Sequence, residues 1–165
     1  MQPTEARMDP LPLRMRQPAP RFQALTEDGR AITLDDFRAR QQGLLIFLLH
    51  GPECPHCAAI AAEMESRRGD WERWGVTALV VTPGGPPHAG TSVAQAVDPR
   101  ALSRYGVPDG EIAVAALEQR GQVMDGWHLR HPAPLDWHEI AETARWIAIQ
   151  EPECSTCGFA PGWEP

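Results

Sequence analysis

Residues 44–57 read LLIFLLHGPECPHC, and this stretch decides the fold of the 165-residue chain. The run from Leu44 to Leu49 has no polar alternation, which predicts a strand buried on both faces in a parallel or mixed sheet. The residues around and after Cys57 are rich in alanine and other good helix formers, so we expect a helix from about Pro55 to Arg68. A pair of cysteines therefore lies at the turn between a buried strand and a helix.

The position of this pair favours redox chemistry. The free N–H groups and the dipole at a helix N-terminus stabilise an anion, so a thiolate there has a lowered pKa and is a good nucleophile. Cys54 is expected at the exposed tip of the turn, and Cys57 one helical turn further in. This order suits attack on a disulfide by Cys54 and resolution of the mixed disulfide by Cys57. Two other interpretations remain open, an inert pair and half of a metal site.

Four neighbouring residues are expected to influence these thiols. Pro55 stiffens the loop. A protonated His56 would stabilise the Cys54 thiolate, whereas a carboxylate at Glu53 would raise the pKa of that thiol. His50 ends the buried strand just before the turn, and we expect it either to act on Cys54 or to be a structural, hydrogen-bonded histidine.

The rest of the chain alternates short strands and helices. This alternation predicts an α/β fold in which a central sheet is flanked by helices on both faces. The expected elements are an N-terminal β-hairpin in 22–34 around the turn Glu27–Gly29, a helix over 35–40 capped by Asp35, a strand over 76–81, a helix from Asp98 to Tyr105, a hairpin of 112–117 and 122–127, and a last helix over 136–150.

The pattern divides the chain into three segments. Residues 1–17 are proline-rich and aperiodic, which predicts a flexible or loosely docked arm. Residues 18–150 have the length of one domain, and the chain is 42% hydrophobic, which suffices for a core without disulfides. Residues 151–165 form a tail that carries a second CxxC pair, Cys154 and Cys157.

Three interpretations of Cys154 and Cys157 remain open. The pair could form a disulfide that holds the tail, or a relay that exchanges with Cys54 and Cys57, since electrons pass between dithiols of different potential. It could also bind zinc, alone or together with the first pair, because two CxxC units supply four thiolates. We expect no cofactor apart from such a zinc ion.

The other histidines give no strong signal. His128 and His131 form an HxxH pattern that we assign to a loop, where exposed residues without a ligand are the simplest interpretation. His88 and His138 have no special sequence context.

Composition excludes several classes of partner. The formal net charge is −7, which argues against nucleic acid or an anionic membrane surface as the main partner. The apolar run from Leu44 to Leu49 is too short to span a bilayer. The first residues contain prolines and arginines where a signal peptide needs an apolar stretch, so we expect a cytoplasmic, reducing location.

Several stretches together resemble the thioredoxin-like superfamily. They are APRFQALTEDGRAITLDDF (19–37), LLIFLLH, CPHC, RYGV (104–107) and AVAALEQRGQV (113–123). More narrowly, residues 18–150 resemble a redoxin, the alkyl hydroperoxide reductase–thiol-specific antioxidant (peroxiredoxin-like) branch. The resemblance implies a thioredoxin-like fold with a central mixed sheet, with Cys54 as attacking and Cys57 as resolving thiol. It also implies a disulfide-bearing protein or a small thiol as substrate, and is compatible with a homodimer.

Departures from the family pattern indicate which chemistry to expect. Peroxiredoxins carry Pro-x-x-x-Thr-x-x-Cys, but Phe47 and Gly51 occupy the proline and threonine positions before Cys54. Thioredoxins place a cis-proline before the later hairpin, where Ile112 or Ala113 stands here. We therefore expect a thiol–disulfide oxidoreductase. The alternatives are a thiol peroxidase and a zinc-stabilised or degenerate binding module without turnover.

Overall fold

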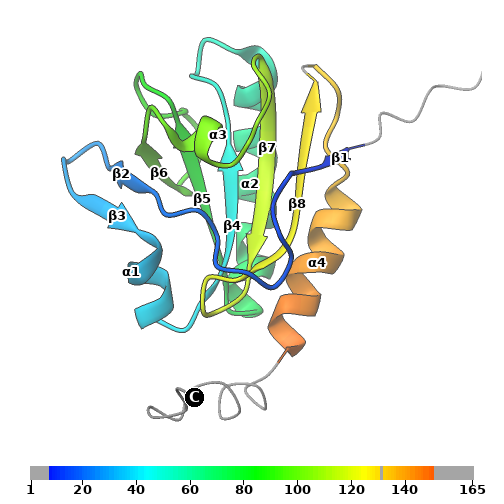
Figure 1. Ribbon diagram of the computed structural model, residues 1–165. Helices are drawn as coiled ribbons and strands as arrows, with labels where there is room; N and C mark the ends of the chain where they lie inside the picture. Colours follow the sequence, from blue (N-terminus) through cyan, green and yellow to red (C-terminus); the bar gives the residue numbers. More distant parts are fainter. Residues whose placement is uncertain (1–7, 131, 151–165) are drawn as a thin grey trace, which may run out of the picture.

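The computed structural model describes residues 8–130 and 132–150, which build one mixed sheet with helices on both sides (Figure 1). The strand order is β1-β8-β7-β4-β5-β6-β2-β3. The strands are β1 (Asp9–Pro10), β2 (Gln23–Leu25), β3 (Ala31–Thr33), β4 (Gly43–Leu48), β5 (Val76–Thr82), β6 (Ala94–Val97), β7 (Glu111–Leu117) and β8 (Val123–Arg130). The helices are α1 (Leu34–Ala39), α2 (Pro55–Arg73), α3 (Ala101–Arg104) and α4 (Trp137–Ile149).

Strand β4 lies at the centre of the sheet, parallel to β5 and antiparallel to β7. Leu45 and Phe47 point to the face that α2 and α4 cover, whereas Leu44, Ile46 and Leu48 point to the face of α1 and α3. All these side chains are buried because each face of the strand has its own helical layer. The prediction of a strand buried on both faces is confirmed.

Helix α2 is longer than the sequence pattern predicts. It passes Gly69 and ends at Arg73, just before Gly75, whose φ of 71° terminates the helix in the left-handed region. A glycine inside a helix costs about 1 kcal/mol. Burial of the Trp71 side chain, which is 1% exposed, offsets this cost.

Two other helix starts differ from the predictions, and one strand was not predicted. Helix α1 begins after Thr33, not at Asp35, because the Asp36 carboxylate accepts a 2.8 Å hydrogen bond from the Thr33 N–H. Helix α3 is a single turn that begins after Arg100. Asp98 stays outside that turn, although its carboxylate accepts a 2.9 Å bond from the Arg100 N–H. Strand β6 was not predicted, since its four residues are too few for a periodic pattern.

Residues 8–17, which belong to the segment predicted as a flexible or loosely docked arm, are docked on the sheet. Strand β1 pairs with β8, and the Leu11 N–H donates a 2.9 Å bond to the oxygen of Gly126. Leu11 is buried beside Gly126, where a Cβ would lie 3.1 Å from the Leu11 side chain, and Met8 is buried in the core on the other face of the sheet. The predicted tail 151–165, with Cys154 and Cys157, lies outside the described residues.

Candidate active site

The turn between β4 and α2 brings the first cysteine pair together. Cys54 is the N-cap of α2, Pro55 is its first residue, and Cys57 lies in the first turn. The Cys57 N–H donates to the Cys54 sulfur across 3.4 Å, and the His50 N–H donates to the Cys57 sulfur across 3.3 Å. Backbone N–H groups from the strand end and from the helix therefore each donate to one of the two sulfurs.

The two thiols differ in exposure. Cys54 is partly exposed, whereas Cys57 is 0% exposed and packs in the core between the sheet and α2. Burial, and after it the adjacent Cys54 sulfur, raises the pKa of Cys57 to about 12. Cys57 is therefore a protonated, shielded thiol at neutral pH, beside a partner that solvent can reach.

His50 links the cysteine turn to the neighbouring strand. Its ring Nε2 lies 3.2 Å from the main-chain oxygen of Glu111, the first residue of β7. A carbonyl oxygen only accepts, so Nε2 carries a proton in this contact. The orientation of the His50 ring is thus set by a backbone oxygen of β7.

His88 is a site residue that the sequence did not reveal. It lies in the loop between β5 and β6 and is 2% exposed. Its Nε2–H donates to the oxygen of His50 across 3.0 Å. The Gln95 amide accepts from the His88 N–H at 2.6 Å and donates to the His88 oxygen at 2.8 Å. No periodicity or motif marks His88, because its partners are a distant backbone oxygen and one amide side chain.

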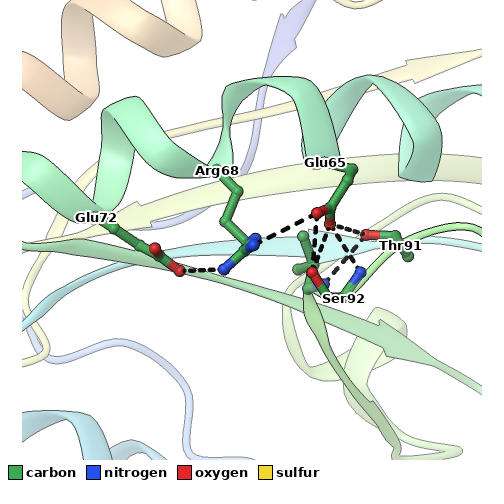
Figure 2. A network of polar contacts seen from close by, with 6 residues as sticks. Glu65, Arg68, Glu72, Thr91 and Ser92 are labelled. Atoms are coloured by element: carbon green, nitrogen blue, oxygen red, sulfur yellow. Dashed lines mark hydrogen bonds and ion pairs between the residues drawn. The ribbon is translucent and has the colours of Figure 1, made fainter.

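A polar network fixes the same loop to the helix that carries the cysteines. Figure 2 shows the Glu65 carboxylate of α2 facing Thr91 and Ser92, while Arg68 lies between Glu65 and Glu72. Glu65 accepts from the Ser92 N–H at 2.7 Å, from the Ser92 hydroxyl at 2.8 Å and from the Thr91 hydroxyl at 3.2 Å. These bonds, the Ser92 N–H first, lower the pKa of Glu65. The loop between β5 and β6 is therefore held at two points. Thr91 and Ser92 bond to Glu65 of α2, and His88 bonds to the main-chain oxygen of His50 after β4.

His128 lies in β8 rather than in a loop, so that prediction is wrong. Strand β8 extends to Arg130, because β7 pairs with it as far as Glu111. The Nδ1 of His128 contacts the Glu111 carboxylate, and Arg130 Nε lies 3.4 Å from the same group. Glu111 thus contacts His128 through its carboxylate and His50 through its main-chain oxygen. His131 lies outside the described residues.

The other predicted neighbours lie around the turn. Pro55 and Glu53 are exposed, and His56 is partly buried. The Glu53 carboxylate folds over Gly51, so a Cβ at Gly51 would collide with it. His138 is exposed on α4.

The turn also has donors that suit a metal ion. One ring nitrogen of His50 and the sulfurs of Cys54 and Cys57 all lie within 4.8 Å of one another. The contribution of Cys154 and Cys157 to such a site lies outside the described residues, so a four-cysteine site stays a prediction.

Within the described parts of the chain, none of the helices has both the length and the apolar character that a bilayer-spanning segment needs. The cytoplasmic location stays a prediction.

Comparisons with known proteins bear on the family and the fold. The model of the AhpC/TSA family matches residues 15–120. Among solved structures, a protein described as the thiol:disulfide interchange protein DsbE from Chlorobium tepidum has a TM-score of 0.67 at 16% identity, over 82% of this chain and 99% of that one. Peroxiredoxin Q from Xanthomonas campestris has a TM-score of 0.65 at 16% identity, over 84% of this chain and 99% of that one.

A peroxiredoxin-like protein from Aquifex aeolicus has a TM-score of 0.67 at 18% identity, over 82% of this chain and 88% of that one. No curated protein matches the sequence. The fold is thus the thioredoxin-like fold, as the resemblance implied.

Proposed function

The chain belongs to the AhpC/TSA family, and from this premise we propose that it is a thiol–disulfide oxidoreductase with Cys54 as attacking and Cys57 as resolving thiol. One observation carries the proposal. The two thiols adjoin at a helix N-terminus, Cys54 partly exposed and Cys57 fully buried. A substrate therefore reaches Cys54 first, and Cys57 reacts only after a mixed disulfide has formed beside it.

The reaction has two displacement steps. The Cys54 thiolate attacks one sulfur of a substrate disulfide, a Cys54–substrate disulfide forms, and the other substrate sulfur leaves as a thiolate. Cys57 then loses its proton, attacks the Cys54 sulfur and displaces the second substrate thiolate. The substrate gains two electrons and the protein ends with a Cys54–Cys57 disulfide, which a small thiol or a dithiol protein reduces again.

His50 is suited to accept the Cys57 proton. One of its ring nitrogens lies within 4.8 Å of both sulfurs. A base is needed because burial holds the Cys57 thiol in its protonated form. We therefore assign to His50 the role of proton acceptor in the resolving step.

Disulfide exchange is favoured over peroxide reduction by residues around Cys54. Gly51 stands at the position where peroxiredoxins carry threonine, so that hydroxyl donor is missing beside the attacking sulfur. The substrate in this proposal is a disulfide-bearing protein or a small disulfide. The homodimer that the resemblance allows stays a prediction that sedimentation analysis tests.

The decisive experiment compares single cysteine variants of the full chain. Cys54→Ser is expected to lose dithiol-dependent reduction of a model protein disulfide. Cys57→Ser is expected to accumulate a mixed disulfide at Cys54, which intact mass spectrometry detects as the added substrate mass.

Retention of full reductase activity by Cys54→Ser would refute the proposal. Hydrogen peroxide consumption far faster than that of free thiols, without disulfide reductase activity, would instead identify a thiol peroxidase. Absence of both activities from the reduced wild-type protein would favour a binding module without turnover.

A further inference from the structure

A cavity of about 540 Å³ lies away from the cysteine turn and is rich in arginine. Four arginines line it, and they come from the segment before β2, from α1, from α3 and from the turn between β7 and β8. They are Arg21, Arg38, Arg104 and Arg120. Among the described lining residues, the single carboxylate is that of Asp35. Positive charge therefore gathers at this cavity in a chain whose formal net charge is −7.

Backbone contacts bring these four segments together. The Ala19 N–H donates a 2.9 Å bond to the oxygen of Gly121, so the segment before β2 lies against the turn between β7 and β8. Arg104 Nη1 donates to the main-chain oxygen of Arg21 across 3.1 Å. The Arg38 side chain packs on Gly121, where a Cβ would lie 3.4 Å from the Cδ of Arg38. The fold itself therefore places the four arginines around one space.

Neighbouring carboxylates neutralise only part of this charge. Arg38 lies 3.1 Å from Asp35, but both side chains are about half exposed or more, so solvent screens the pair. Arg104 lies 3.5 Å from Asp98. Within residues 8–130 and 132–150, the guanidinium of Arg21 has neither an ion pair nor a hydrogen bond. Arginines gathered around one cavity repel each other, and an anion between them removes this repulsion.

We propose that this cavity binds a small metabolite with two or more negative charges, carried by phosphate or carboxylate groups. The planar guanidinium fork pairs with two oxygens of either group, which suits arginine to such ligands. The volume fits an organic molecule better than a lone ion, since ligand cavities usually measure about 300–1,000 Å³. Phe22 and Leu34 line the same cavity and offer apolar surface to the rest of the molecule.

The cavity lies at the end of the sheet opposite to the cysteine turn. Strand β7 runs antiparallel to β4, so its turn into β8 lies beside the start of β4, whereas the cysteines follow the end of β4 (Figure 1). The ligand therefore does not compete with a disulfide for the thiols, and the site does not depend on the proposed thiol chemistry. Because the ligand contacts four segments of the folded chain, its binding stabilises the folded state by mass action.

The test uses the full-length protein and two probes, pyrophosphate and citrate. Titration calorimetry at constant ionic strength is expected to show one bound equivalent of at least one probe. The probe that binds more tightly identifies phosphate or carboxylate chemistry. The midpoint of thermal unfolding is expected to rise with the concentration of that probe, and to rise less with sodium chloride at the same ionic strength.

Two variants that remove the same charge separate the cavity from the rest of the surface. Arg21→Gln is expected to weaken binding about tenfold, as for loss of a hydrogen bond to a charged group, without lowering the unfolding midpoint of the free protein. Arg145→Gln is the matched control, because Arg145 lies on α4, its side chain is 60% exposed and it does not line the cavity. It is expected to bind the probe like the wild type. Arg21→Lys keeps the charge without the fork and is expected to lose less than Arg21→Gln.

Three results would overturn the proposal. The first is that neither probe binds the wild type at one equivalent or stabilises it more than sodium chloride does. The second is that Arg21→Gln binds the probe as tightly as the wild type. The third is an equal loss of affinity in Arg21→Gln and Arg145→Gln, which would show a response to net charge alone.

Discussion

The ring Nε2–H of His88 donates a hydrogen bond to the main-chain oxygen of His50 across 3.0 Å. The main-chain N–H of the same His50 donates to the Cys57 sulfur across 3.3 Å. A buried loop residue thus holds the strand end from which the resolving thiol receives a hydrogen bond. Any change that releases this strand end is expected to alter both the stability of the fold and the geometry of the dithiol.

Replacing His88 by alanine tests this relationship. The variant removes the buried ring N–H of His88, so the main-chain oxygen of His50 loses this hydrogen bond. The free energy of unfolding is therefore expected to fall by about 1–3 kcal/mol. His88→Gln keeps an N–H donor and is expected to lose less. Urea unfolding measures the change, with the exposed His138→Ala as the matched control. Equal unfolding midpoints for His88→Ala and wild type would show that the contact does not stabilise the fold.

Glu65 and Glu72 form a matched pair for testing the loop anchor. Both carboxylates contact Arg68, but only Glu65 accepts bonds from Thr91 and Ser92 (Figure 2). In Glu65→Ala, amide hydrogen exchange at Ser92 is expected to accelerate roughly tenfold, as for loss of a local hydrogen bond. In Glu72→Ala it is expected to stay at the wild-type rate. Equal exchange at Ser92 in both variants would contradict the anchoring role of Glu65.

Sequence patterns predicted the centre of the molecule well. The apolar run from Leu44 reports burial on both faces, and the alanine-rich stretch after Cys57 reports helix propensity. Together these two signals located β4, α2 and the cysteine turn between them. The relation of Cys54 to the helix start follows from the same two segments.

The supporting contacts could not be predicted in the same way. His88 and Glu111 meet His50 through main-chain atoms, across sequence separations of 38 and 61 residues. A backbone oxygen accepts from any suitable donor, so no residue pattern marks such a bond. His128 was assigned to a loop because the end of β8 is set by its pairing with β7, which only the three-dimensional structure gives.

Trp71 connects the long helix α2 to the sheet and to α4. Its ring lies 5.9 Å from that of Phe47 and 6.5 Å from that of Trp137, and its side chain is 1% exposed. Trp71→Ala is expected to lower the free energy of unfolding by about 3–5 kcal/mol, the usual cost of truncating a buried aromatic residue. Trp146, which is 40% exposed, provides the control, and Trp146→Ala is expected to cost no more than about 1 kcal/mol. Similar losses for both variants, in chemical denaturation, would argue against a central role for Trp71.

Asp125 on β8 makes the stability of the fold depend on pH. Partial burial raises the pKa of this carboxyl above its ordinary value of 3.8, although its bond from the Gly126 N–H acts in the opposite direction. The folded state therefore binds more protons than the unfolded state once the pH rises above that value, so stability falls as the pH rises through the shifted range. Asp125→Asn keeps an oxygen acceptor for the Gly126 N–H and removes the charge.

Asp125→Asn is therefore expected to be more stable than wild type at pH 7. This difference in stability is expected to disappear as the pH falls to the ordinary pKa of an aspartate, 3.8. Urea unfolding between pH 4 and 7 measures this, with Asp109→Asn at an exposed position as control. A stability difference that stays constant over this range would show that the effect of Asp125 arises from packing and not from its charge.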